Sequence, residues 1–318
     1  MSTVQEAAMN TMAGCMGVKK GESVLVICDA PLRRIGFALR EAANELCAEA
    51  MLLEIIPRSR HGEEPPPAVA LFMKAVDVLV CPTSYSLTHT EARRAATKAG
   101  VRAATMPGIT EECMKRTLTA DYDKIAALSE KVAKVLSSGA HARVSSPAGT
   151  DIEFSIRGRA ALADTGLVHK PGDMSNLPAG EAFLAPVEGT AEGVVVFEAA
   201  VAGLGKLGGE KIRIRVERGY AVEITGRAQA RKLDEMLEGY GQDAYNIAEL
   251  GIGTNDKAVI SGKILEDEKI LGTVHLALGD NKSMGGKVGV SSHLDGLILK
   301  PSVWIDGERI MEHGKLLI

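Results

Sequence analysis

Aromatic residues are scarce in this sequence, since Phe, Trp and Tyr together make up 3% of the 318 residues. A chain with so few aromatic side chains offers little surface for stacking nucleic-acid bases. An excess of positive charge is also lacking, because 37 lysines and arginines are outnumbered by 41 aspartates and glutamates, and the pI is about 6.0. We therefore expect no nucleic-acid partner and no binding to an anionic membrane surface.

Closely spaced cysteine pairs and long apolar runs are absent as well. The five cysteines are Cys15, Cys28, Cys47, Cys81 and Cys113, and no two of them have the CxxC spacing of a metal or redox pair. This usage predicts reduced, mostly buried thiols and a cytoplasmic location. No apolar run reaches the roughly 20 residues that a membrane helix needs, and the N-terminal segment does not resemble a signal peptide.

Strand-like and helical patterns alternate over residues 1–139. Apolar runs typical of buried strands lie at 23–28, 51–56, 76–81 and 101–106, and segments with helical spacing at 34–50, 68–75, 88–100 and 121–139. The alternation predicts an α/β domain with a mostly parallel sheet. Its first strand leads into CDAPLRRIG, which matches neither common phosphate-binding glycine pattern, so we expect no bound nucleotide. We expect this domain to cover the second domain or to form a dimer contact.

Residues 140–318 differ in composition and pattern, with frequent glycine and short segments in which apolar and polar residues alternate. Hairpins are predicted around the turn SPAGT (146–150), around Arg218-Gly219 and around Asp306-Gly307, and one helix at 230–241. The segment is therefore expected to form an α+β, mainly antiparallel β domain.

The candidate chemistry of the second domain begins with an H-x-D pair, His293 and Asp295. Residues two apart on a strand point to the same face, so both side chains can reach one cation. His275, in the strand-like segment GTVHLALGDN, completes two histidines and a carboxylate, the minimum set for a catalytic transition-metal site. For H-x-D alone, a buried histidine paired with aspartate for structural reasons is at least as good an interpretation.

Two glutamates that lie next to apolar or glycine-rich segments extend this set. Glu181 opens an apolar strand in NLPAGEAFLAPVEG, and Glu249 lies where NIAELGIGTN enters a glycine-rich loop. With the two histidines and Asp295 they would suffice for two cations. The acidic run at 266–268 is predicted to be a solvated turn, with Glu268 a possible neighbour of the metal ligands.

These four segments, in this order, resemble the M29 metallopeptidases, the aminopeptidase T or thermophilic leucyl-aminopeptidase family. The resemblance implies one or two divalent metals, zinc or cobalt, a peptide substrate cleaved at its N-terminus, and a homodimer. It places the metal ligands on Glu181, Glu249, His275, His293 and Asp295. It assigns no catalytic acid or base.

One position departs from the peptidase pattern, because Lys282 stands where the peptidases carry a tyrosine. Lys282 is therefore a second possible neighbour of the metal site. A sister branch, the 2,5-dihydroxypyridine dioxygenases, uses one non-haem iron on two histidines and a carboxylate, and His275, His293 and Asp295 could serve that chemistry. The leading hypothesis is a metal-dependent aminopeptidase; the alternatives are an iron(II) ring-cleaving dioxygenase acting on a small molecule and a degenerate site that only binds a ligand.

Overall fold

The computed structural model describes residues 2–47 and 49–318, which form two compact units. The first unit contains Met1–Ala126 and Thr165–Ala179, and the second contains Ala127–Asp164 and Gly180–Ile318. The sequence placed a single boundary at residue 139, whereas the chain leaves the first unit after 126 and returns to it for 165–179. The role assigned to the first unit, a cover or a dimer contact, stays a prediction.

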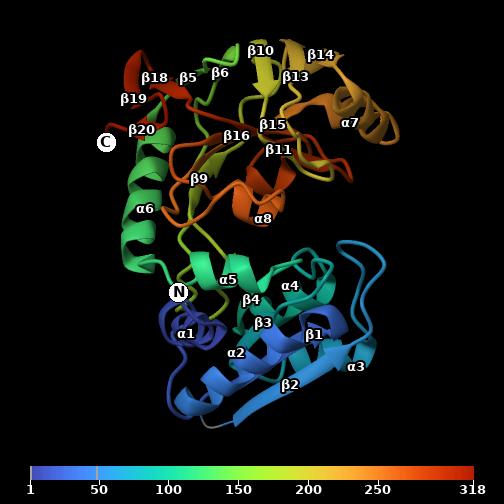
Figure 1. Cartoon of the computed structure of the whole chain (residues 1–318), viewed down its shortest axis with the longest axis vertical. Coiled ribbons are helices and arrows are strands. Elements are labelled where there is room, and N and C mark those ends of the chain that lie inside the picture. Colours follow the sequence, from blue (N-terminus) through green and yellow to red (C-terminus); the bar gives the residue numbers. More distant parts are fainter. Residues whose placement is uncertain (1, 48) are drawn as a thin grey trace. The chain divides into compact units, whose positions relative to one another are not determined.

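The first unit is built on a five-stranded parallel sheet, as the alternating pattern predicted (Figure 1). The strand order is β2-β1-β3-β4-β8, formed by Glu49–Ile55, Ser23–Asp29, Val78–Cys81, Arg102–Thr105 and Met174–Asn176. The helices are α1 (Val4–Asn10), α2 (Arg33–Leu46), α3 (Pro67–Met73), α4 (Glu91–Lys98) and α5 (Glu111–Thr117), and a π-helical turn over Thr11–Cys15 follows α1. Thr90 caps α4 by accepting the N–H of Arg93. The fifth strand, β8, was not predicted, because its three residues follow a long irregular segment.

The second unit contains two mainly antiparallel sheets. The first has the order β14-β13-β10-β6-β5-β18-β19-β20, formed by Tyr220–Gly226, Ile212–Glu217, Glu192–Phe197, Asp151–Ser155, His141–Ser145, Ser302–Ile305, Glu308–Glu312 and Lys315–Leu316. The second, called the site sheet below, has the order β12-β11-β17-β16-β15-β9-β7, formed by Gly205–Lys206, Ala200–Val201, His293–Ile298, Val274–Gly279, Ile247–Gly253, Glu181–Leu184 and Leu162–Asp164. Helix α6 (Tyr122–Ser138) begins in the first unit and continues into the second, which also contains α7 (Ala228–Glu238) and α8 (Ile264–Asp267). The predicted hairpins and the helix near 230–241 are confirmed.

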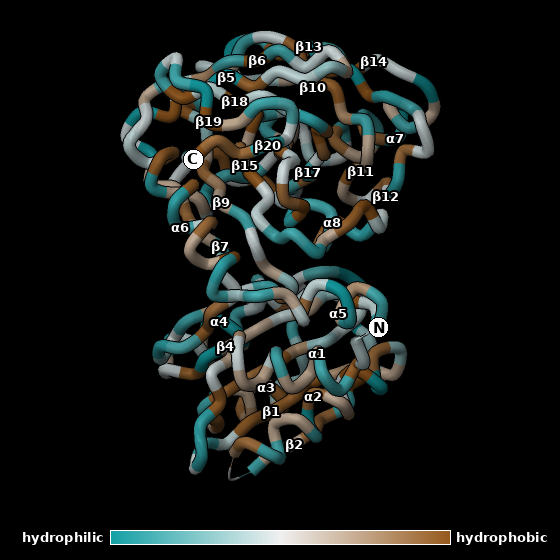
Figure 2. Tube along the Cα trace, turned by 60° about the vertical axis from the view of Figure 1, so that its left-hand side comes forward, coloured by the Kyte–Doolittle hydropathy of each residue, from teal (hydrophilic) through white to brown (hydrophobic). Residues whose placement is uncertain are grey.

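The core of the second unit is formed by alternate residues of these strands. On β13, Ile212, Ile214 and Val216 are buried, while the two arginines and the glutamate that alternate with them are exposed. The buried faces of both sheets join one apolar cluster that includes Phe154 and Phe197. Figure 2 shows the apolar residues concentrated along the strands. One face of the site sheet packs against this core. Alternate side chains of the same strands point away from the core, to the opposite face.

No disulfide joins the five cysteines, all of which lie within the described residues, and Cys47 is the only one that is not buried. Burial raises the pKa of Cys28 to about 11 and that of Cys81 to about 12. Since the thiolate is the reactive form, Cys47 should be the only cysteine of the native protein that iodoacetamide alkylates quickly. Peptide mass spectrometry before and after urea denaturation checks this, with Cys47→Ser as the control. Rapid native alkylation of Cys28 or Cys81 would contradict it.

Among the described residues, no helix is both long and apolar enough to cross a membrane.

Candidate metal centre

Four neighbouring strands of the site sheet carry the five predicted ligands on its outer face. Leu250, Leu276 and Ile298 join the core, so residues one position away on the same strands point to the opposite face. That face receives Glu181 from β9, Glu249 from β15, His275 from β16, and His293 and Asp295 from β17. The five residues, which span 115 positions of the sequence, are therefore brought together by strand pairing.

Two groups of donor atoms form on this face, with Glu249 common to both. Glu181, Glu249 and His275 form one, and Glu249, His293 and Asp295 form the other; within each group the ligand atoms lie within 4.8 Å of one another. Nε2 of His275 lies 3.2 Å from Oε2 of Glu181 and 3.3 Å from Oε1 of Glu249. Nε2 of His293 lies 3.0 Å from the other Glu249 oxygen, Oε2, and 3.5 Å from Oδ1 of Asp295.

The spacing of these donors fits a metal ion. Ligands about 2.1 Å from a tetrahedral ion are roughly 3.4 Å apart, close to the separations measured here. Oε2 of Glu181 is buried and makes no hydrogen bond in the structure, although it faces the His275 imidazole. A buried carboxylate oxygen without a hydrogen-bond donor is costly unless a cation approaches it. The donor set and this oxygen together fit a divalent cation.

The surrounding backbone positions both imidazoles. Nδ1 of His293 lies 2.8 Å from the carbonyl oxygen of Asp280, and donation to that carbonyl leaves Nε2 free to bind a metal. His275 is paired across the sheet with Gly251, where a Cβ atom would overlap the imidazole ring. The glycine at 251 therefore makes the space in which the His275 ring lies.

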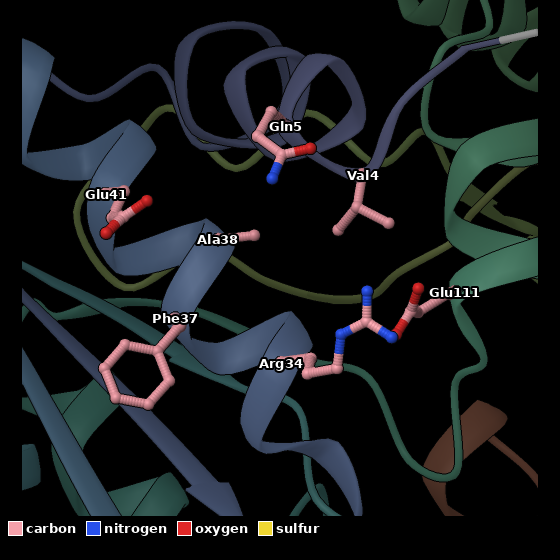
Figure 3. A pocket seen from close by; sticks show the side chains of 7 residues that line it. All are labelled: Val4, Gln5, Arg34, Phe37, Ala38, Glu41 and Glu111. Atoms are coloured by element: carbon pink, nitrogen blue, oxygen red, sulfur yellow. The ribbon is translucent and has the colours of Figure 1, made fainter.

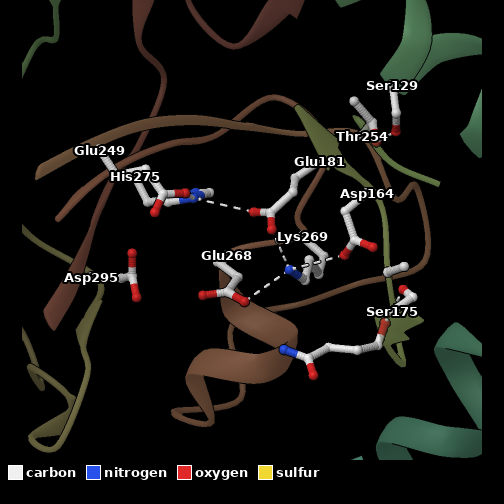
Figure 4. A network of polar contacts seen from close by, with 12 residues as sticks. Ser129, Asp164, Ser175, Glu181, Glu249, Thr254, Glu268, Lys269, His275 and Asp295 are labelled. Atoms are coloured by element: carbon white, nitrogen blue, oxygen red, sulfur yellow. Dashed lines mark hydrogen bonds and ion pairs between the residues drawn. The ribbon is translucent and has the colours of Figure 1, made fainter. Parts of the chain in front are cut away.

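A buried lysine that the sequence analysis missed adjoins this centre (Figure 4). Nζ of Lys269 lies 2.5 Å from Oε1 of Glu181, 2.8 Å from Oε1 of Glu268 and 3.4 Å from Oδ2 of Asp164. Asp164 on β7 is paired directly with Glu181 on β9, which puts both carboxylates on one face. Glu268 and Glu181 thus share Lys269 as a partner, and the role of Glu268 at the site stays a prediction.

The prediction that residues 266–268 form a solvated turn is wrong. Glu266 and Asp267 are completely buried, and their carboxylates accept backbone N–H groups of the preceding loop: Val259 for Glu266, and Ser261 and Gly262 for Asp267. The carboxylates are buried because they satisfy backbone donors that would otherwise be left unpaired. An acidic run gives no local sign of such partners.

The charges of the cluster shift its pKa values in opposite directions. Burial raises the pKa of Glu181, but Lys269 and His275 outweigh it and hold that pKa below the ordinary value. Burial also dominates at Glu268 and, helped by Glu181 and Asp295 against Lys269, raises its pKa to about 8. Burial lowers the pKa of His275, yet Glu181 and Glu249 raise it well above its usual range. A metal ion would therefore have to displace protons from this centre.

The role of Lys282, the other predicted neighbour of the site, stays a prediction. Lys282 is exposed on the loop after β16, and its ammonium forms no ion pair with any described carboxylate. Glu188 holds this loop instead, because its Oε1 accepts the side-chain N–H of Asn281 and the backbone N–H of Lys287.

A separate hollow of about 210 Å³ lies in the first unit (Figure 3). It is lined by Val4, Gln5, Arg34, Phe37, Ala38, Glu41 and Glu111. Its charged groups are the exposed Arg34, which pairs with Glu111 at 3.1 Å, and Glu41. None of these residues is a candidate metal ligand, so the hollow is not part of the candidate metal centre.

Comparison with known proteins decides the family. The sequence model of the family described as NicX, 2,5-dihydroxypyridine 5,6-dioxygenase, matches residues 4–318. The chain belongs to this family. A 2,5-dihydroxypyridine 5,6-dioxygenase from Pseudomonas putida (strain KT2440) is 24% identical over 218 residues, which cover 65% of this chain. The match spans 62% of that relative's own length.

Two solved structures share the fold. The 2,5-dihydroxypyridine dioxygenase from Pseudomonas putida KT2440 has a TM-score of 0.83 at 21% identity, covering 100% of this chain and 98% of that one. Wild-type AmpT from Thermus thermophilus has a TM-score of 0.73 at 18% identity, covering 99% of each. The likeness to aminopeptidase T is thus one of fold. The family shown is the dioxygenase branch, so membership of the M29 family stays a resemblance.

Proposed function

We propose that this chain is a metal-dependent enzyme that opens a hydroxylated nitrogen-containing aromatic ring with molecular oxygen. The observation that carries the proposal is the pair of imidazoles converging on Glu249 with Asp295 beside them, in a chain whose family is described as a dioxygenase. Two histidines and one carboxylate are the ligand set of many non-haem iron(II) oxygenases. Iron(II) bound there would supply the one-electron chemistry that lets oxygen react with an aromatic substrate.

The chain's own residues would hold the ion and prepare the site. His275, His293 and Asp295 would be ligands, with Glu249 between the imidazoles as a further ligand or as an acceptor for the proton of a ring hydroxyl. The His293 side chain is 31% exposed while those of His275 and Glu249 are nearly buried, which leaves His293 as the side from which a small molecule can approach. The Asp280 carbonyl would keep the His293 ring in place during that approach.

Amide hydrolysis by two metal ions is the second candidate, and a specific observation favours it. The two oxygens of Glu249 face different histidines, and each histidine has a further carboxylate, so this face offers donors that could hold two cations. Bound cations would supply an activated water and a Lewis acid in that case. The fold shared with AmpT is compatible with this candidate.

Oxygen dependence separates the two candidates. Protein loaded anaerobically with iron(II) should consume oxygen when 2,5-dihydroxypyridine is added, and should leave amino-acyl anilides intact under nitrogen. His293→Gln should lower oxygen uptake by more than the ~10–100-fold seen when a neighbour of a metal ligand is lost. His141→Gln, at an exposed histidine of the same unit, is the matched control. Anilide cleavage without oxygen, with two metal ions per chain, would favour the hydrolase.

A further inference from the structure

The loop that joins β16 to β17 is part of the surroundings of the candidate metal centre, because these two strands carry three of the candidate ligands. The loop covers residues 280–292 and has glycine at positions 285, 286 and 289, where the backbone is little restricted. Such a segment keeps one conformation only if other groups hold it. Two charged side chains from other loops of the second unit, Arg159 and Glu188, contact it.

Glu188 accepts two hydrogen bonds from the loop with a single oxygen. Its Oε1 accepts the side-chain N–H of Asn281 at 2.9 Å and the backbone N–H of Lys287 at 2.7 Å. Its Oε2 pairs with Arg159 at 2.5 Å, and Arg159 also donates to the loop carbonyl of Gly285. The side chains of Arg159 and Glu188 are 12% and 18% exposed, so water screens these charge-assisted contacts only weakly.

Asn281 connects these contacts to His293. Its Oδ1 accepts the backbone N–H of Val288 at 2.9 Å, and its own backbone N–H donates to the Val288 carbonyl at 3.1 Å. The planar peptide unit that contains this Asn281 N–H carries the Asp280 carbonyl on its opposite side. That carbonyl is the group 2.8 Å from Nδ1 of His293. A rotation of this one peptide unit would therefore turn the carbonyl away from the imidazole.

The orientation of this peptide unit depends on how the Asn281 side chain is held. Strand pairing fixes the preceding unit, whose N–H, that of Asp280, donates to the Ser292 carbonyl at 2.8 Å. Asn281 itself is completely buried, and a Cβ atom at Gly286 would lie 2.1 Å from its Oδ1. The amide thus fits closely between Gly286 and Glu188, and displacing it from either side would disturb the Asp280 carbonyl.

We propose that Glu188 is a positioning residue for His293. Paired with Arg159, it holds the β16–β17 loop so that the Asp280 carbonyl keeps the His293 ring turned with Nε2 towards the carboxylates of the centre. The His293 side chain is 31% exposed, so its ring has room to rotate once that carbonyl moves. The inference rests on the proposed function, since it takes His293 as a metal ligand, and it adds a residue that acts on the ion only through the loop.

Zinc affinity and the Nδ1 proton of His293 together test the inference on the full-length chain. Competition with a chromophoric chelator measures the affinity. Proton–nitrogen NMR of zinc-loaded, histidine-labelled protein detects the ring N–H, and comparison with His293→Gln at saturating zinc identifies its signal. Glu188→Ala should bind zinc about 10-fold more weakly than wild type. It should also exchange the Nδ1 proton rapidly with water, because the Asp280 carbonyl no longer accepts it.

A second variant and a matched control separate this role from a general loss of stability. Gly286→Ala displaces the Asn281 amide while Glu188 stays in place, and it should change affinity and proton exchange in the same direction. Glu192→Ala is the control, because Glu192 accepts the backbone N–H of Arg218 in a different loop of the same unit. It should leave both measurements as in wild type.

Each result has a defined meaning. An unchanged zinc affinity or an unchanged Nδ1 signal in Glu188→Ala would overturn the inference, even if the variant were less stable in urea, and so would an equal loss in Glu192→Ala. If Glu188→Ala does not fold, Gly286→Ala decides alone. A wild type that binds no zinc would contradict the proposed function and the inference with it. A wild type that binds zinc beside an unaffected Glu188→Ala would contradict the inference alone.

Discussion

Glu249→Gln should abolish metal binding and, with it, all activity of the centre. Glutamine has nearly the same shape, but it is neutral and presents one oxygen where Glu249 presents two, each facing a different imidazole. One of the two histidines would then meet an amide N–H₂ group, which cannot bind a cation. We expect Zn²⁺ affinity to fall by more than ~100-fold, beyond the effect of losing a group that only orients a ligand.

Competition with a chromophoric chelator measures the affinity, and oxygen uptake with 2,5-dihydroxypyridine measures the activity. Glu238→Gln is the matched control, because Glu238 is exposed at the end of α7. Circular dichroism should show the same secondary structure for both variants. Zinc affinity of Glu249→Gln within threefold of wild type would remove Glu249 from the ligands of the ion.

Gly251→Ala should both destabilise the fold and weaken metal binding. The new Cβ would overlap the His275 imidazole, and that ring lies on a buried strand with little room to move. Overpacking of a buried site costs about 1–3 kcal/mol, and we expect the upper end of that range because the overlap involves a ring. The displaced ring would also lose its alignment with Glu181 and Glu249, which should lower metal affinity by at least tenfold.

Urea denaturation of the metal-free protein measures the loss of stability, and competition with the chelator measures the loss of metal affinity. Gly239→Ala is the control, since a Cβ there would meet only the Met236 carbonyl oxygen, at an ordinary distance of 3.8 Å. If Gly251→Ala matched Gly239→Ala in both measurements, the close fit between Gly251 and His275 would contribute neither to stability nor to metal affinity.

The sequence by itself determined the features that depend on short-range patterns. Apolar runs alternating with helical spacing predicted the parallel sheet of the first unit, and the alternation around Arg218-Gly219 predicted the β13–β14 hairpin. The H-x-D pair predicted that His293 and Asp295 share a face, because strand periodicity is a local property. The sequence context suggested Glu181, Glu249 and His275 as their companions, and the resemblance in four segments pointed to the same residues. The structure brings all five together.

Only the tertiary structure decided what surrounds those ligands. The residues 266–268 were predicted to form a solvated turn and Lys269 drew no prediction, yet Lys269 is buried, because Asp164, Glu181 and Glu268 converge on it. The structure likewise decided that the side chain of Lys282 is exposed. These outcomes depend on which strands pair and which loops fold back over them. The free energy of a buried charge is set by partners distant in sequence, so local composition does not reveal it.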